Sequence, residues 1–280
     1  MTGQSEKGVL LFNVYQLLEG HSILISAWIW GVLVVGTIVG LAIGGMFLVR
    51  RSVTLSTLES HNQVAGFIYS VVGVVYAVLL AFIAIVVWQQ HTQVQTQIEQ
   101  EANQLGDLYR NAQVFPEEVR TRLQSQIRAY GRIVLEKEWP AMAKGETSVD
   151  AWAAYNQLWR AYQQVEARND HERLWYSKSL DQLDQLGDYR RLRVLSNRAA
   201  VPALMWVVLL ATGIITIGFS FFFGTTNSSA QALMIAALSA TIGFVLFLIW
   251  ALNHPFAGLI RVEPVAFHHV WTIIEQSAQQ

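Results

Sequence analysis

The most informative absence in this 280-residue sequence is cysteine, of which it contains none. Without thiols the chain cannot form disulfides, zinc–thiolate sites or a cysteine nucleophile, so these chemistries are excluded. Charged residues are also scarce, at 14% of the chain against 53% hydrophobic residues. A soluble domain normally has about 25% charged residues, so the composition indicates a membrane protein.

Neither sign of charge prevails, because the formal net charge is −1. Nucleic-acid binding needs a basic surface, interleaved with aromatic residues where single strands are bound. The sequence has no such stretch, so nucleic acid is not expected as a partner. The charges are also unevenly distributed, since 30 of the 39 charged residues (19 Lys and Arg with 20 Asp and Glu) lie between Gln89 and Arg198. This segment is expected to meet water and most of the remainder to meet the lipid bilayer.

Asp, Glu, Lys and Arg are missing from four long hydrophobic runs. About 20 apolar helical residues cross a hydrocarbon core, and each run is long enough to do so: 22–49, 64–88, 199–223 and 230–253. We therefore predict an all-α membrane protein with four transmembrane helices and a helical-bundle cytoplasmic domain inserted between the second and third. The expected segments are an N-terminal segment (1–21), a first transmembrane hairpin (22–88), a helical soluble domain (89–198), a second transmembrane hairpin (199–253) and a C-terminal tail (254–280).

The Lys and Arg residues beside the spans set the predicted orientation. Arg50 and Arg51 lie on one side of the membrane, and six cations lie on the other: Lys7, Arg190, Arg191, Arg193, Arg198 and Arg261. Tryptophans at the ends of the spans gather at a single face of the membrane. Both termini and the middle domain are therefore expected in the cytoplasm, although Arg50 and Arg51 oppose this orientation.

Apolar residues of the middle segment recur at three- and four-residue steps, as is typical of amphipathic helices. The second span is expected to continue as such a helix to Pro116. There Pro116-Glu117-Glu118 starts another helix, which is expected to end at Trp139-Pro140. Ser148 is the predicted N-cap of a third helix, and a fourth begins near Asp170. Together these helices predict a small bundle, two of whose helices continue into membrane spans.

Two stripes of residues on the second span indicate different roles. Small residues at helical spacing allow close helix packing, either inside one subunit or between subunits; they are Gly36, Gly40 and Gly44 in the first span, and Gly66, Ser70, Gly73, Ala77, Ala81 and Ala84 in the second. The other stripe consists of Tyr69, Gly73, Tyr76, Leu80 and Ile83. Its side chains either line an axial pore with a hydrophobic constriction or pack between helices, with neighbours satisfying the tyrosine hydroxyls.

Polar residues near the spans give two further candidate sites. At the mouth of the second span lie Glu59, His61 and Asn62, as a polar ring, a weak ion site or interface anchors. A basic run of Arg190, Arg191, Arg193 and Arg198 precedes the third span. In an oligomer this run would form a collar around a cytoplasmic vestibule and concentrate anions. The alternatives are positive-inside topology and salt bridges to Asp184 or Asp188.

No Asp, Glu, Lys, Arg or His lies inside a span away from its ends. Proton-coupled transporters and pumps usually need such residues at membrane depth, so a passive pore or a structural or sensory unit is favoured. Glu136 and Glu138 are paired carboxylates, but side chains two residues apart on a helix diverge and no His, Ser or metal partner is evident. We expect no enzyme activity, no metal site and no cofactor.

Seven blocks of the sequence form an ordered pattern. The blocks are His61-Asn62-Gln63-Val64-Ala65-Gly66, Val75-Tyr76-Ala77-Val78-Leu79-Leu80-Ala81-Phe82, Glu101-Ala102 with Leu105, Glu138-Trp139-Pro140, Arg190-Arg191-Leu192-Arg193, Leu204-Met205-Trp206 and Pro255-Phe256-Ala257-Gly258. In this order they resemble the bacterial bestrophin-like domain family. The resemblance extends from Glu59 to Phe267, and the chain departs from the family pattern Leu-Asp-x-Pro-Phe at Asn253.

The resemblance implies a remote link to bestrophins, which are homopentameric anion channels. It implies four membrane helices per subunit, cytoplasmic termini and a pore lined mainly by the second helix. It implies no calcium site, because the acidic cluster of animal bestrophins has no counterpart here.

Three hypotheses about function remain open. The leading one is a homo-oligomeric ion channel of the bacterial inner membrane that conducts anions such as chloride, with lipid, inorganic ions and copies of itself as partners. The second is a membrane sensor or scaffold whose helical domain binds a signal or a partner. The third is a proton channel that energises a partner, which would have to supply the titrating group because the spans lack acids.

Overall fold

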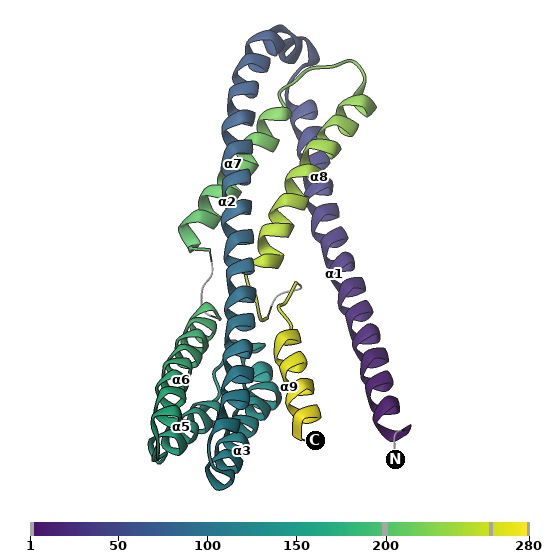
Figure 1. The fold of residues 1–280 in the computed structure, drawn as a ribbon. Coiled ribbons are helices and arrows are strands. Elements are labelled where there is room, and N and C mark those ends of the chain that lie inside the picture. Colours follow the sequence, from purple (N-terminus) through teal and green to yellow (C-terminus); the bar gives the residue numbers. More distant parts are fainter. Residues whose placement is uncertain (1–2, 198–200, 258–259, 279–280) are drawn as a thin grey trace. The chain divides into compact units, whose positions relative to one another are not determined.

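The computed structural model describes residues 3–197, 201–257 and 260–278, with side chains from Trp28 to Ser277 within these ranges. Every regular element in these ranges is a helix (Figure 1). The chain divides into two compact units. Unit 1 comprises Met1–Trp88 and Val201–Asn253, and unit 2 comprises Gln89–Ala200 and His254–Gln280.

Unit 1 contains the four apolar helices. They are α1 (Gly3–Ser52), the first part of α2 (Leu55–Asn111), α7 (Ala203–Ser220) and α8 (Ser228–Leu252). Each is long and apolar enough to cross a membrane, which confirms the four predicted helices. Because α2 runs without interruption from Leu55 to Asn111, the same helix belongs to both units, as the sequence pattern predicts.

Helix α1 packs along α8 with close approaches at glycine. A Cβ added at Gly31 would lie 3.0 Å from the ring of Phe247, and one at Gly243 would lie 3.3 Å from Ile38. The other apolar cluster of unit 1 joins α2, α7 and α8 around fully buried Leu209 and Ile249. With lipid outside, such close van der Waals packing holds the helices together.

Unit 2 is a helical bundle around its own apolar core. Besides the second part of α2 it contains η1 (Ala112–Val114), α3 (Glu117–Ile133), η2 (Val134–Glu138), α4 (Trp139–Met142), α5 (Val149–Gln163), α6 (Asp170–Ser196) and α9 (Val265–Ala278). The predicted N-cap is confirmed, because Ser148 Oγ accepts from the Ala151 N–H at 3.3 Å. Asn169 caps α6 in the same way, accepting from the Glu172 N–H at 2.9 Å.

Two parts of unit 2 differ from the prediction. The chain stays helical through Trp139-Pro140, because the π-helical turn η2 precedes α4 and places Pro140 in its first turn, where a missing N–H costs little. The second difference is α9 in the C-terminal tail, for which no helix was predicted. Phe267, Val270 and Ile274 of α9 are buried in the core of unit 2.

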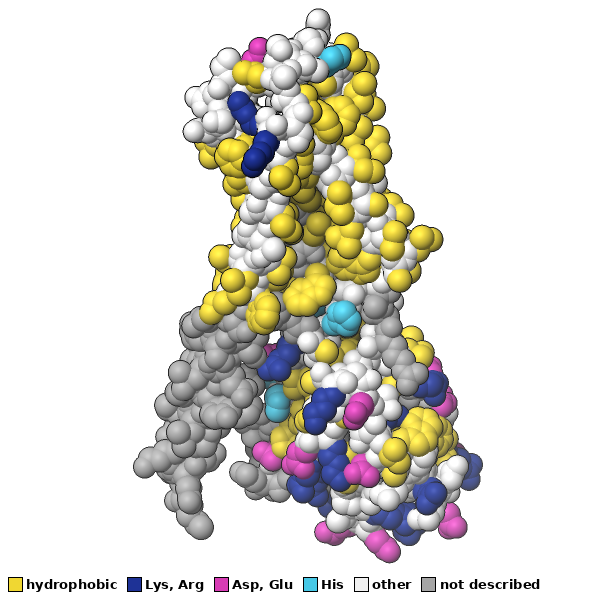
Figure 2. All heavy atoms as spheres, turned by 180° about the vertical axis from the view of Figure 1, so that it is seen from behind, with side chains coloured by type: hydrophobic (Ala, Val, Ile, Leu, Met, Phe, Trp, Pro, Cys, Tyr) yellow, Lys and Arg dark blue, Asp and Glu magenta, His cyan; other side chains and the backbone are white. Residues whose placement is uncertain are grey.

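The surfaces of the two units differ in chemistry. Figure 2 shows hydrophobic side chains spread over the helices of unit 1, and Lys, Arg, Asp and Glu side chains spread over unit 2. Exposed apolar residues on the spans include Phe67, Leu204 and Leu233, each more than 70% exposed. A surface of this kind suits contact with lipid in unit 1 and with water in unit 2.

Candidate functional site

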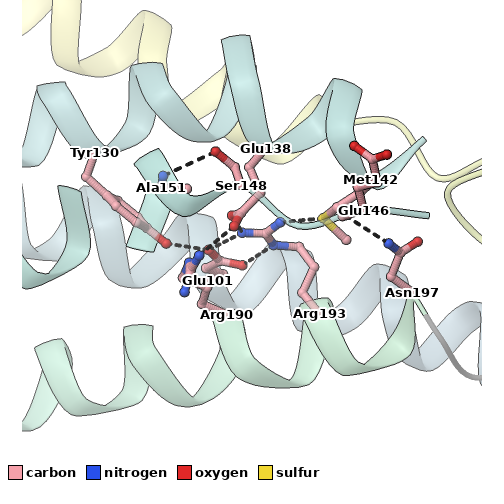
Figure 3. A network of polar contacts seen from close by, with 10 residues as sticks. All are labelled: Glu101, Tyr130, Glu138, Met142, Glu146, Ser148, Ala151, Arg190, Arg193 and Asn197. Atoms are coloured by element: carbon pink, nitrogen blue, oxygen red, sulfur yellow. Dashed lines mark hydrogen bonds and ion pairs between the residues drawn. The ribbon is translucent and has the colours of Figure 1, made fainter. Parts of the chain in front are cut away.

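A buried cluster of charges lies in the interior of unit 2 (Figure 3). Arg193 donates from Nε to Glu101 Oε2 at 2.6 Å and from Nη2 to Glu101 Oε1 at 3.0 Å, a bidentate pair. Nη2 also donates to Glu138 Oε2 at 2.6 Å. All three side chains have no solvent exposure. The guanidinium is therefore held by two carboxylates at once, an arrangement typical of strong charge-assisted hydrogen bonds.

Three further side chains complete this cluster. Arg190 donates from Nη2 to Glu138 Oε1 at 2.5 Å, so that Glu138 bridges the two arginines. The hydroxyl of Tyr130 donates to Glu101 Oε1 at 2.8 Å. The remaining nitrogen of Arg193, Nη1, lies 2.9 Å from the sulfur of Met142. With two arginines and two carboxylates, the cluster is electrically balanced.

The mutual pairing holds the cluster in its charged form. Burial alone lowers the pKa of Arg193, but the carboxylates of Glu101 and Glu138 outweigh it and keep that pKa well above its ordinary value. Burial, followed by the charge of Glu101, raises the pKa of Tyr130 well above its ordinary value. The tyrosine therefore stays a neutral donor at physiological pH.

Aromatic rings enclose the Arg193 guanidinium. Its central carbon lies 5.4 Å from the centroid of the Trp139 ring and 6.0 Å from that of Phe267. Trp139 in turn meets the ring of Phe256 edge to face, at 5.8 Å between centroids. The rings keep water away from the ion pairs and add cation–π attraction.

The cluster is suited to holding helices together and not to acid–base catalysis. Both carboxylates are fully engaged with guanidinium groups, so neither is a free proton acceptor. Within the described ranges, no three His, Asp or Glu side chains gather where they could hold a metal ion. The pairs do join α2, which continues from a membrane span, to α6, which precedes another span.

The predicted basic collar is divided by these contacts. Arg190 and Arg193 are buried in the cluster, whereas Arg191 is exposed and pairs with Asp188, one of the two acids proposed as alternative partners. Arg198 lies outside the described residues. Two of the four arginines are thus neutralised by carboxylates of the same chain, because a cation buried without a partner would be too costly.

The predicted pore-lining stripe of α2 faces the interior of unit 1. Tyr76, Leu80 and Ile83 are at most 7% exposed and pack with α7 and α8. Tyr69 is half-buried and stacks on Phe219 at 5.8 Å between centroids. This arrangement matches the alternative in which the tyrosines lie between helices. The Tyr76 hydroxyl differs from that expectation, since it has no hydrogen-bond partner within the described ranges.

Other faces of α2 are open. Val71, Val74 and Val78 are between 52% and 64% exposed and lie on the side away from Tyr76. Gly73 belongs to the stripe of Tyr69 and Tyr76, yet a Cβ added there would meet no described atom within 4 Å, and the same holds for Gly36, Gly40 and Gly44 of α1. These small residues are therefore not needed for packing among the described residues of the chain.

The predicted mouth residues separate into one structural and two exposed side chains. Asn62 donates from Nδ2 to the Gly224 carbonyl at 2.8 Å and accepts from the Gly224 N–H at 2.9 Å. This pairing ties the start of α2 to the loop after α7. A Cβ at Gly224 would lie 2.6 Å from the backbone nitrogen of Glu59, so the close approach requires glycine. The side chains of Glu59 and His61 are exposed.

The comparison with protein families covers most of the chain. Residues 25–267 match the family model described as the Bestrophin-like domain. The chain belongs to the bestrophin-like family. No curated protein sequence matches this chain.

Solved structures share the bestrophin-like fold. A bacterial bestrophin homologue from Klebsiella pneumoniae, in a point-variant form, has 14% sequence identity and a TM-score of 0.66, with 88% of this chain and 99% of that one covered. A second variant of this homologue has 13% identity and a TM-score of 0.61 at the same coverage. A structure described as a membrane protein gives 14% identity and 0.66, again at this coverage. These likenesses establish the fold of this bestrophin-like chain.

The buried cluster brings together four of the sequence blocks that carry the bestrophin-like resemblance. Glu101, Glu138 with Trp139, Arg193 and Phe256 come from separate blocks and meet in one interior. A sequence signal for the pairing does exist. Glu101 follows buried Ile98 by three residues, and Arg190 and Arg193 continue the inward spacing of Leu183 and Leu186. Charges at core positions of two helices predict a buried ion pair.

Proposed function

We propose that this bestrophin-like chain is one subunit of a homopentameric anion channel whose pore is lined by α2. The observation that carries the proposal is the exposed valine face of α2, in a chain of this family whose spans hold no charge. A pore formed by copies of one helix needs a face that the helix's own subunit leaves open. Val71, Val74 and Val78 provide such a face, and a hydrophobic constriction of this kind gates by dewetting.

The uncovered glycines support contact between subunits. A Cβ added at Gly73 of α2 would meet no described atom within 4 Å, and Gly36, Gly40 and Gly44 lie on α1 with open space around them. Small residues at four-residue spacing let helices from neighbouring subunits approach closely.

The part of α2 in unit 2 supports anion conduction by its chemistry. Gln93, Thr96, Gln100 and Asn103 lie on one side of the helix and are exposed or half-buried. Amide and hydroxyl groups donate hydrogen bonds to chloride without a fixed charge that would trap it. We place this side of α2 in a cytoplasmic vestibule, in place of the four-arginine collar.

Chloride flux through proteoliposomes tests the pore assignment. Val78→Thr keeps the side-chain shape but adds a hydroxyl, so the flux is expected to rise by about tenfold if the dewetting barrier falls by roughly 1.4 kcal/mol. Val207→Thr on α7 is the matched control, because Val207 is 62% exposed, and its flux should equal that of the unchanged protein. Flux at the protein-free level for every variant contradicts the channel, and equal flux in both variants contradicts the valine face.

Labelling of a single cysteine tests the proposed orientation, with termini and unit 2 in the cytoplasm of a bacterial inner membrane. The chain has no native cysteine, so Ser177→Cys, at an exposed position of α6, provides a unique target. An impermeant maleimide should label it in inverted vesicles and leave it unlabelled in intact spheroplasts. Labelling from the outside alone would reverse the orientation and favour the sensor or scaffold hypothesis.

A further inference from the structure

A pocket of about 480 Å³ lies in unit 2, between the start of α5 and the last turns of α6. Its walls are mainly apolar and contain two arginines; they are formed by Thr147, Ser148, Val149, Trp152, Arg190, Arg191, Val194 and Leu195. Volumes of this size accommodate small organic ligands. The proposed pore does not use this pocket, so ligand binding there would not depend on the channel function.

One side of the pocket is built to attract an oxyanion. The first N–H groups of a helix have no carbonyl partner within that helix, and α5 begins at Val149 in the pocket wall. Arg190, another wall residue, is only 5% exposed. Its Nη2 donates to Glu138, but its buried Nε has no hydrogen-bond partner within the described ranges. The pocket thus contains the start of α5 together with a buried guanidinium.

The other side of the pocket offers an apolar surface. Val149 is 81% exposed, Leu195 65% and the Trp152 ring 46%. The Trp152 ring also lies 5.0 Å from the guanidinium carbon of Arg190. Exposed side chains of this size beside a cation are typical of a site for a ligand with a charged head and an apolar body.

Three acids near the pocket are paired with cations, whereas Glu146, which precedes the wall residue Thr147, is exposed to solvent. Asp150 follows Val149 and binds Lys137 Nζ at 2.5 Å, and Asp188 is paired with Arg191. Glu138 is shared between Arg190 and Arg193. Because these carboxylates are compensated by cations, the donors of the α5 N-terminus decide the sign of the preferred ligand.

The geometry points to this pocket as a binding site for a small water-soluble carboxylate that carries an aromatic or branched apolar body. The carboxylate would lie at the start of α5 beside Arg190, and the apolar body would lie against Trp152 and Leu195. Such a ligand would lie next to the buried cluster, since Arg190 belongs to both the pocket and the cluster.

Calorimetric titration of the full-length protein in detergent tests this site with phenylacetate as the probe. Phenylacetate should bind about tenfold more tightly than neutral phenylacetamide or acetate, because the two controls lack the charge and the apolar body respectively. Val149→Asp should weaken phenylacetate binding by about tenfold while leaving the fold intact, since Asp is favourable in the first turn of a helix. The unfolding temperature checks that the variant is folded.

Leu174→Asp is the matched control for that substitution. Leu174 is 69% exposed on α6 and lies outside the pocket walls, so its variant should bind phenylacetate as the unchanged protein does. Equal binding of phenylacetate and phenylacetamide, or equal loss in both Asp variants, would overturn the site. Absence of any binding would also overturn it. Tighter binding of decanoate than phenylacetate would identify a fatty acid as the ligand and overturn the water-soluble class.

Discussion

The two units bury opposite chemistries beneath opposite surfaces. Unit 1 exposes apolar side chains, and none of its described buried residues is charged. Unit 2 exposes Lys, Arg, Asp and Glu, yet it encloses Glu101, Glu138, Arg190 and Arg193 in its interior. Polarity of the surface therefore does not predict polarity of the interior in this chain.

The difference follows from how each unit fixes the positions of its helices against one another. Apolar helices in lipid gain little from hiding apolar side chains, so close packing at Gly31 and Gly243 sets how α1 meets α8. In water, apolar residues drive the helices of unit 2 together without fixing their register. The bidentate Arg193–Glu101 pair fixes the register of α6 against α2, because a shift of one helical turn would leave buried charges unpaired.

Removal of the Arg193 cation should have the largest effect on the stability of unit 2. Arg193→Met leaves Glu101 and Glu138 buried without their shared partner, so we expect a loss of about 3–5 kcal/mol in the free energy of unfolding of unit 2. Chemical unfolding followed by circular dichroism in detergent measures this loss. Arg173→Met is the control, because Arg173 and its partner Asp170 are both exposed, and its effect should be close to zero.

A triple variant separates the effect of charge from the effect of packing. Arg193→Met combined with Glu101→Gln and Glu138→Gln removes the charges together, so it should recover much of the stability lost in Arg193→Met alone. A triple variant as unstable as the single one would show that packing around Met142 and Trp139, and not charge, carries the effect.

The sequence predicts the elements of the fold well because each leaves a local signal. Four runs without charge give the spans, and Ser148 and Pro116 mark helix starts that the structure contains. Helix α9 was missed, although Pro264 precedes it and Phe267, Val270 and Ile274 recur at helical spacing. The steps of three and four residues between these apolar side chains are the local signal that predicts α9.

The partners of a helix face are harder to predict than the helix itself. The stripe through Tyr76 and Leu80 is real, but periodicity does not say whether a face meets α7, a neighbouring subunit or a pore. The arginine run shows the same limit, since Arg190 and Arg193 resemble a solvent-exposed collar until Glu101 is placed opposite them. The spacing that continues from Leu183 and Leu186 places both arginines on the core side of α6, but it does not identify the carboxylate, 92 residues away, that Arg193 meets.

A matched pair of tyrosine variants, one in each unit, is expected to have the smallest effects on stability. Tyr130→Phe removes the hydroxyl that donates to Glu101 in unit 2 and should destabilise it by about 1.5–3 kcal/mol, as for other hydrogen bonds to charged groups. Tyr76→Phe removes a buried hydroxyl without a described partner in unit 1, so stability should stay the same or rise slightly. Thermal unfolding of both variants in detergent provides the measurement.

The Tyr76 result is the more discriminating of the two. A marked loss of stability in Tyr76→Phe would mean that the hydroxyl does find a partner, and repeating the measurement on dissociated subunits would locate that partner. Loss confined to the oligomer would place it on a neighbouring subunit, whereas equal loss in both states would place it within the chain. An unchanged stability would mean that Tyr76 stabilises unit 1 through van der Waals packing of its ring beside Gly213 and not through its hydroxyl.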